Sequence, residues 1–147
     1  MHFEFTPITM EYVKEIDDWD FSGFAEEVMM TPYIESYEKD KSLKGPAGCD
    51  GFVAMRDGEP VGLFEFNLKG NRLEIGLALR PDLVGKGSGA DYVRQGIAFG
   101  VQYYDSNIDV VELVVDASNK AAIRVYEKVG FTSIVEDDKE IEMKMEL

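Results

Sequence analysis

Apolar residues in the second half of the chain recur with two different periods. Residues 72–79, RLEIGLAL, carry leucine or isoleucine at every second position, which predicts a strand with one apolar face. Its other face is small and bears one carboxylate, Glu74. Over residues 90–104 the spacing changes to three and four residues, which predicts a helix packed on a sheet. Gly96 and Gly100 lie one turn apart in that helix and favour its close approach to the sheet.

The remainder of this half predicts a strand, a helix and two more strands. VVELVV at 110–115 is an almost continuous apolar run, typical of a strand that is buried on both faces and paired in parallel. A helix should follow, capped by Ser118 or Asn119 and ended by Gly130. Two alternating strands are then predicted around 131–136 and 140–146.

The N-terminal part predicts helices ahead of the main strands. A short edge strand is predicted at residues 3–5, and Thr9 is a plausible cap for a helix. Residues 24–30, FAEEVMM, are typical of a second helical piece, which Pro32 should stop. Residues 31–51 show little periodicity, which predicts a long connection over the surface.

Two hairpins are predicted in the middle of the chain. Asp57 and Gly58 form a strong turn signal between two extended runs. A second turn is predicted at residues 69–71, ahead of the alternating strand. The expected order is therefore a strand, helices, three antiparallel strands, a helix, a strand, a helix and two strands.

Composition narrows the class of protein. The 147 residues are 45% hydrophobic and 30% charged, which is typical of one packed domain over residues 1–147. No segment approaches the roughly 18 apolar residues that span a bilayer, and MHFEFTPITM lacks the features of a secretion signal, so we expect a cytoplasmic protein. One cysteine, Cys49, and one histidine, His2, give neither an internal disulfide nor a metal site.

The chain is strongly acidic, with 15 Lys plus Arg, 29 Asp plus Glu and a net charge of −14. Nucleic acids and anionic membranes require basic surface, so the charge disfavours both as partners. A cationic small molecule suits this field better. An acidic surface that only keeps the protein soluble explains the charge equally well.

The apolar strand runs into a glycine-rich turn at residues 83–90, LVGKGSGA, and then into a helix. This order predicts an anion site, because the first amides of a helix lack internal partners and glycine lets a phosphate approach the main chain. A nucleotide P-loop is excluded, since Arg80 stands where its first glycine belongs and Gly87 follows Lys86. A dinucleotide fingerprint is disfavoured, because only one clear strand–helix unit follows.

RPDLVGKGSGA at 80–90, followed by DASNKAAIRVYEKVGF at 116–131, resembles the two coenzyme A motifs of the GNAT N-acetyltransferase superfamily. That family has Arg or Gln before the first glycine, where this chain has Val84, so one side-chain contact is lost but the main-chain amides remain. The resemblance implies an α+β fold in α/β/α layers. Its central sheet would be mixed and mostly antiparallel, with about seven strands, a splayed parallel pair and about four flanking helices.

The resemblance also implies where acetyl-CoA, as acyl-donor cosubstrate, would bind. Amides of the glycine-rich turn would wrap the pyrophosphate, and the main chain of residues 78–80 would pair with the pantetheine arm. An amide in that stretch would face the thioester oxygen, where negative charge develops. The implied binding residues are Ala78, Leu79, Arg80, Gly85, Lys86, Gly87, Ser88, Gly89, Ala90, Asn119 and Tyr126, with no metal.

Two side chains carry implied catalytic roles. Tyr126 shares one helix face with Asn119 and would protonate the departing thiolate; the alternative is an ordinary core ring. The attacking amine must be neutral, and Glu74 matches a base position in some members, although it equally suits a solvent-facing strand carboxylate. Glu65 is the reserve base, and some members use no dedicated base. Attack would be direct in a ternary complex, so Cys49 is not the nucleophile.

The acetyl acceptor is expected over the acidic N-terminal helices and residues 31–51. A cationic primary amine, in a small molecule or a peptide, suits the charge. A homodimer is left open, and so is a non-catalytic acyl-CoA sensor or interaction module on the same fold. Candidate acceptor residues are the aromatic side chains of Tyr12, Trp19, Phe21, Tyr33 and Tyr37 and the carboxylates of Glu26, Glu27 and Glu35.

Overall fold

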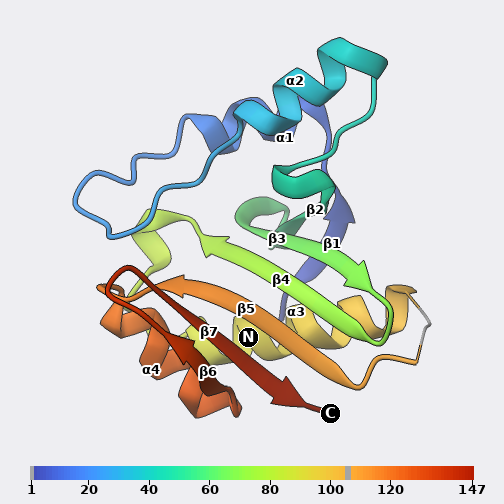
Figure 1. Ribbon diagram of the computed structural model, residues 1–147. Helices are drawn as coiled ribbons and strands as arrows, with labels where there is room; N and C mark the ends of the chain where they lie inside the picture. The colour runs from blue at the N-terminus through green and yellow to red at the C-terminus, as the bar shows by residue number, and fades with distance from the viewer. Residues whose placement is uncertain (1, 105–106) are drawn as a thin grey trace.

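A computed structural model describes residues 2–104 and 107–147. In this part of the chain, seven strands form one mixed sheet in the order β1-β2-β3-β4-β5-β7-β6. Helices α1 and α2 lie on one face of the sheet and α3 and α4 on the other (Figure 1). The layered α+β fold that the resemblance implies is therefore confirmed.

The strands are β1 (Glu4–Pro7), β2 (Asp50–Arg56), β3 (Glu59–Lys69), β4 (Arg72–Leu79), β5 (Val110–Asp116), β6 (Thr132–Glu136) and β7 (Glu140–Glu146). The α-helices are α1 (Met10–Asp17), α2 (Thr31–Asp40), α3 (Gly89–Tyr104) and α4 (Lys120–Val129). Two short 3₁₀ turns are η1 (Pro46–Gly48) and η2 (Pro81–Leu83).

The parallel pair, β4 and β5, is joined at one end only. Arg72, Leu73 and Glu74 pair with residues 110–112, and the described pairing stops there. Beyond Glu74 the two strands diverge, as Figure 1 shows. Every other pair of neighbouring strands is antiparallel. The divergence opens a gap in the middle of the sheet.

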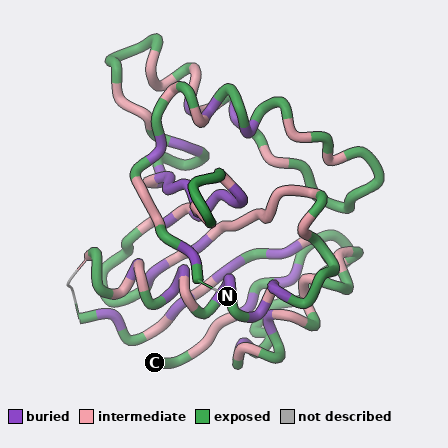
Figure 2. The backbone as a smooth tube through the Cα atoms, turned by 180° about the vertical axis from the view of Figure 1, so that it is seen from behind, coloured by how far each residue is buried: buried purple, intermediate pink, exposed green. Residues whose placement is uncertain are grey.

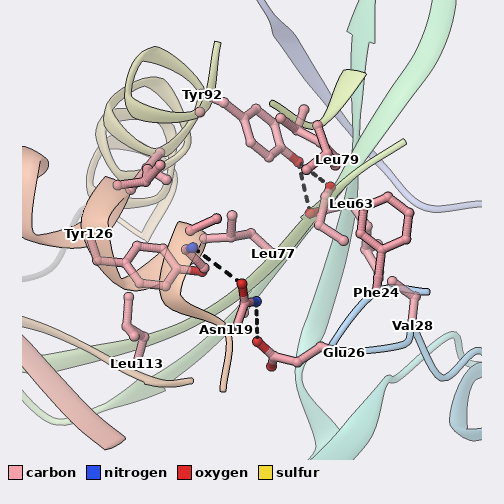
Figure 3. Close-up of a pocket in the computed structure, with 18 of the residues that line it drawn as sticks. Phe24, Glu26, Val28, Leu63, Leu77, Leu79, Tyr92, Leu113, Asn119 and Tyr126 are labelled. Carbon is pink, nitrogen blue, oxygen red and sulfur yellow. Dashed lines mark hydrogen bonds between the residues drawn. The ribbon is translucent and has the colours of Figure 1, made fainter. Parts of the chain in front are cut away.

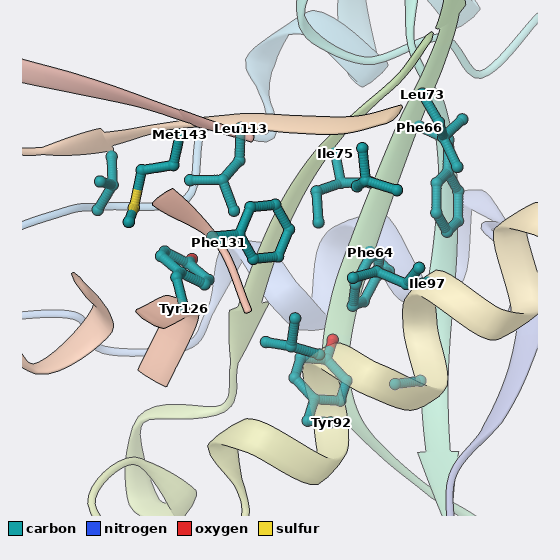
Figure 4. Packing of buried hydrophobic residues seen from close by; sticks show 14 of the residues in the cluster. Phe64, Phe66, Leu73, Ile75, Tyr92, Ile97, Leu113, Tyr126, Phe131 and Met143 are labelled. Atoms are coloured by element: carbon teal, nitrogen blue, oxygen red, sulfur yellow. The ribbon is translucent and has the colours of Figure 1, made fainter. Parts of the chain in front are cut away.

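Two apolar clusters hold the layers together. The larger cluster lies between the sheet and helices α3 and α4 and contains Phe64 and Tyr92 (Figure 4). The smaller cluster packs α1 and α2 against the other face and contains Tyr33 and Leu63. Figure 2 shows buried positions concentrated along the sheet and α3. A side chain at Gly96 would overlap the ring of Phe64, so the predicted close approach of this helix is confirmed.

Local turn and cap predictions are confirmed where their chemistry is strong. Asp57 and Gly58 both have positive φ, 52° and 79°, as a tight two-residue hairpin turn requires. Asn119 caps α4 by accepting a hydrogen bond from the amide of Ala122 at 3.2 Å. Gly130 follows the helix with φ of 128°. In the described part of the chain, no helix is long and apolar enough to cross a membrane.

Two predictions in the N-terminal half are wrong. Residues 24–30 are not helical, and a helix, α2, begins at Thr31 inside the segment predicted as a connection. Pro32 lies in the first turn of α2, where the missing N–H would have no helical partner in any residue, so it starts this helix. A further prediction, that residues 110–115 are buried on both faces, is also wrong: burial alternates along β5, and Val114 is 47% exposed because it lines the open pocket between β4 and β5.

Candidate active site

A pocket of about 520 Å³ occupies the gap between β4 and β5 (Figure 3). β4 lines one side of it from Ile75 to Leu79, and α4 lines another with Asn119, Val125 and Tyr126. The glycine-rich turn and the start of α3 contribute a third side. Residues 21 and 24–29, which lie between α1 and α2, line the pocket from the other face of the sheet.

The β4 side of the gap presents unused main-chain groups. The amide of Arg80 donates to the carbonyl of Val61 at 2.8 Å, in register with the β3–β4 ladder. Because main-chain groups alternate in direction along a strand, the amides of Leu79 and Leu77 point the other way, into the gap. Of the predicted residues 78–80, Leu79 is therefore the one whose amide faces the pocket. An extended ligand with hydrogen-bonding groups can add to β4 along this edge.

The glycine-rich turn has the geometry of an anion site. Gly85 and Gly87 have φ of 78° and 87°, in the left-handed region that side chains disfavour. No described residue accepts a hydrogen bond from the amides of residues 85–90, and the α3 ladder begins with Tyr92 donating to the carbonyl of Ser88 at 2.9 Å. Unpaired amides at the start of a helix, together with the helix dipole, favour an anion at such a position.

Most of the predicted coenzyme residues line the pocket, and the other three, Arg80, Lys86 and Ser88, are predicted to bind through their main chain and have side chains outside the lining. The side chain of Arg80 pairs with Asp82 at 2.7 Å instead of entering the pocket. Ser88 is buried and Lys86 is exposed, and neither side chain is part of the pocket lining. The predicted residues that line the pocket are Ala78, Leu79, Gly85, Gly87, Gly89, Ala90, Asn119 and Tyr126.

Tyr126 points from α4 into the pocket, with Leu77 on the facing strand (Figure 3). Its side chain is 9% exposed, and its hydroxyl donates to no described residue. Burial raises the pKa of the Tyr126 phenol, and the charge of Glu26 raises it further. The phenol therefore stays protonated at neutral pH, as a proton donor must.

The two candidate bases lie in different surroundings. Glu74 is at the last paired position of β4, outside the pocket lining, and accepts a hydrogen bond from Nζ of Lys69 at 3.2 Å. Glu65 lines the pocket and lies opposite Gly76, two residues further into the gap. Burial raises the pKa of Glu65, against the effect of its hydrogen bonds. The structure therefore brings the reserve candidate, Glu65, into the site and leaves Glu74 at its edge.

Of the residues predicted for the acceptor side, some line the pocket and others do not. Phe21, Glu26 and Glu27 line the pocket as the sequence suggests, whereas Tyr33 is buried in the core and Glu35 is not part of the lining. The segment around them also exposes two large apolar side chains that sequence reasoning missed, Phe24 at 40% and Met29 at 60%. Their position in a pocket wall explains why apolar groups are left uncovered.

The charged side chains in the pocket lining are the carboxylates of Glu26, Glu27 and Glu65 and the ammonium of Lys128. Among the described residues, no group of three or more His, Cys, Asp and Glu side chains is arranged to hold a metal ion. The other polar groups of the lining include main-chain amides of the glycine-rich turn and the phenol of Tyr126. Together these groups suit a ligand with an anionic part and a cationic partner.

Comparisons with known proteins agree with this arrangement. Residues 10–131 match the acetyltransferase (GNAT) family. The chain is 32% identical over 133 residues to the spermidine N(1)-acetyltransferase of Escherichia coli, covering 84% of this chain and 67% of that protein. It is 36% identical over 92 residues to the mycothiol acetyltransferase of Streptomyces coelicolor, covering 60% of this chain but only 28% of that longer protein.

Solved structures show the same fold. The Campylobacter jejuni N-acetyltransferase PseH in complex with acetyl coenzyme A superposes with a TM-score of 0.73 at 17% identity, covering 99% of both chains. A Vibrio cholerae spermidine N-acetyltransferase chimera gives a TM-score of 0.75 at 16% identity, covering 99% of this chain and 96% of that one.

Proposed function

This chain belongs to the acetyltransferase (GNAT) family, and from that premise we propose that it transfers the acetyl group of acetyl-CoA to a primary amine of a cationic polyamine. The observation that carries the proposal is the gap between β4 and β5, because it joins an anion site to a carboxylate-lined mouth. The acetyl donor and the amine would enter this gap from opposite faces of the sheet and meet without a covalent enzyme intermediate.

The donor end is supported by the main chain. Amides of residues 85–90 hold the pyrophosphate, and the β4 edge at Leu77 and Leu79 pairs with the pantetheine arm. One of these two amides faces the thioester oxygen, where a preset donor stabilises the charge that develops during attack. Asn119 is the N-terminal cap of α4, and its side-chain amide is already engaged by the amide of Ala122 and by Glu26.

The acceptor end is supported by charge and by apolar surface in one segment. Glu26 and Glu27 bring two carboxylates to the pocket, beside the exposed side chains of Phe24 and Met29. A polyamine alternates ammonium groups with methylene chains, so it uses both kinds of contact. The spermidine acetyltransferase relative acts on a substrate of this chemistry.

Two side chains are proposed to move protons. Glu65 accepts the proton of the incoming ammonium, because it lines the pocket and burial makes its carboxylate more basic. Tyr126 donates its proton to the departing thiolate from the opposite wall. Glu74 would act only through a water, since it lies outside the lining.

The proposal is tested by release of free thiol from acetyl-CoA with a panel of amines, comparing spermidine and 1,4-diaminobutane with neutral amino alcohols. Turnover with the di- and polyamines at the lower KM supports the proposal. Acetyl-CoA at a hundred times its Kd should also stabilise the fold by about 2.7 kcal/mol, which a melting curve detects. Stabilisation without turnover on any amine would indicate a sensor. The absence of both stabilisation and turnover would contradict the proposed site.

A further inference from the structure

We propose that Tyr33 of α2 is a positioning residue for proton transfer, in that its buried hydroxyl directs one oxygen of Glu65 away from the reaction and leaves the other facing the acetyl site. This inference rests on the proposed function, because it assigns Tyr33 to the deprotonation of the acceptor amine. Tyr33 itself touches neither substrate in this arrangement, since it is fully buried and does not line the pocket.

The two oxygens of Glu65 have different surroundings. Oε2 accepts a hydrogen bond from the hydroxyl of Tyr33 at 2.5 Å. Oε1 lies over β4, 3.3 Å from the position that a Cβ on Gly76 would occupy. Gly76 lines the pocket beside Leu77, whose amide faces the gap. The oxygen that Tyr33 does not hold is therefore the one next to the reacting groups.

The hydroxyl of Tyr33 is held in a closely fitted socket. A Cβ on Gly45 would lie 2.6 Å from that oxygen, and a Cβ on Gly51, at the start of β2, would overlap it. Tyr33 is 0% exposed and packs in the cluster beneath α1 and α2. A ring fixed in this way fixes the carboxylate that it holds.

Few other ionisable groups face Glu65. The nearby thiol of Cys49 lowers the pKa of the carboxylate, and the charge of Glu65 raises the pKa of the Tyr92 phenol on α3. No cation contributes to the shift of its pKa. The hydrogen bond from Tyr33 and the neighbouring Cys49 thiol both lower the pKa of Glu65, so loss of either raises that pKa.

The test is the pH profile of kcat/KM for Tyr33→Phe, measured with spermidine on the full chain. A base must be ionised, so the rate rises with pH through the pKa of Glu65, and this rise should move to higher pH in the variant. We expect kcat to fall about tenfold at neutral pH while the KM for acetyl-CoA stays near that of the parent. Tyr103→Phe, on α3 and outside the pocket lining, is the control and should leave the profile unchanged.

A second variant keeps the inference testable if Tyr33→Phe does not fold. Cys49→Ala removes the other group that lowers the pKa of Glu65 and should move the profile in the same direction by less. If both variants bind acetyl-CoA and acetylate spermidine with the profile of the parent, Tyr33 has no positioning role. If the parent itself turns over no amine, the proposed function fails first, which is a distinct result.

Discussion

Asn119 donates a hydrogen bond from Nδ2 to Oε1 of Glu26 at 2.7 Å and so joins α4 to a segment 93 residues earlier in the chain. Because Oδ1 of Asn119 caps α4, both ends of this amide are engaged. The contact crosses the pocket, as Figure 3 shows. An ammonium group that pairs with Glu26 would compete with the Asn119 amide for the same carboxylate.

Glu26→Gln should therefore raise the KM for spermidine about tenfold, since a charged hydrogen bond is worth roughly 1.5–3 kcal/mol and the amide keeps the bond to Asn119 but loses the charge. The KM for acetyl-CoA should change little. Glu11→Gln, on the exposed side of α1 and away from the pocket, is the matched control for net charge. An equal rise of KM in both variants would indicate a general field effect.

Tyr126→Phe should lower kcat by about ten- to a hundredfold, because it removes the proposed proton donor and little volume. The affinity for acetyl-CoA should stay close to that of the parent, which a binding titration measures. Tyr103→Phe, at a ring that is 54% exposed and outside the pocket, is the control. Unchanged turnover in Tyr126→Phe would remove this phenol from the mechanism.

Gly87→Ala should weaken acetyl-CoA binding about tenfold, because it disfavours the left-handed main chain that directs amides at the phosphate. Gly70→Ala is a close match, since Gly70 also has positive φ, 65°, and open space at the Cβ position, but lies in the β3–β4 turn. Both variants should lose about 1 kcal/mol of stability. Only the first should change the Kd, and similar Kd values in both would argue against the turn as phosphate site.

Glu65→Gln should change how stability depends on pH. The pKa of Glu65 is raised in the folded state, so its contribution favours folding below the unfolded pKa and declines as pH rises through the folded pKa. The variant lacks this decline and should gain Tm relative to the parent as pH rises. Melting curves from acidic to mildly alkaline pH measure the difference, and parallel curves would contradict the shifted pKa.

The sequence predicted best those elements whose signals are local. The turn at Asp57 and Gly58 and the cap at Asn119 depend on neighbours within a few residues, and both form as expected. The α2 helix was missed because a proline can either end a preceding helix or stand in the first turn of the next one, and Pro32 does the second. Residues 24–30 resemble a helix because their apolar residues are spaced for contact, but those residues serve the pocket wall.

Only part of the site was predicted, because only some of its residues lie in contiguous motifs. The glycine-rich turn and Tyr126 are carried by contiguous motifs, and both line the pocket. The choice between Glu74 and Glu65 depends on where β4 separates from β5 and on the register of β3, neither of which short-range patterns specify. The partnership of Tyr33 with Glu65 links α2 to β3 and has no signal in either segment alone.

Because β4 and β5 pair over a short stretch only, the sheet has two halves, β1 to β4 and β5 to β7, joined by few direct hydrogen bonds. Three residue pairs join the two halves directly, and beyond them the facing main-chain groups of β4 and β5 are not hydrogen-bonded to each other. A cosubstrate bound along β4, as proposed, would form hydrogen bonds with the first half and would contact the second half through α4. Binding of the cosubstrate would then also stiffen the domain, so the cosubstrate would act for a time as a structural element of the sheet.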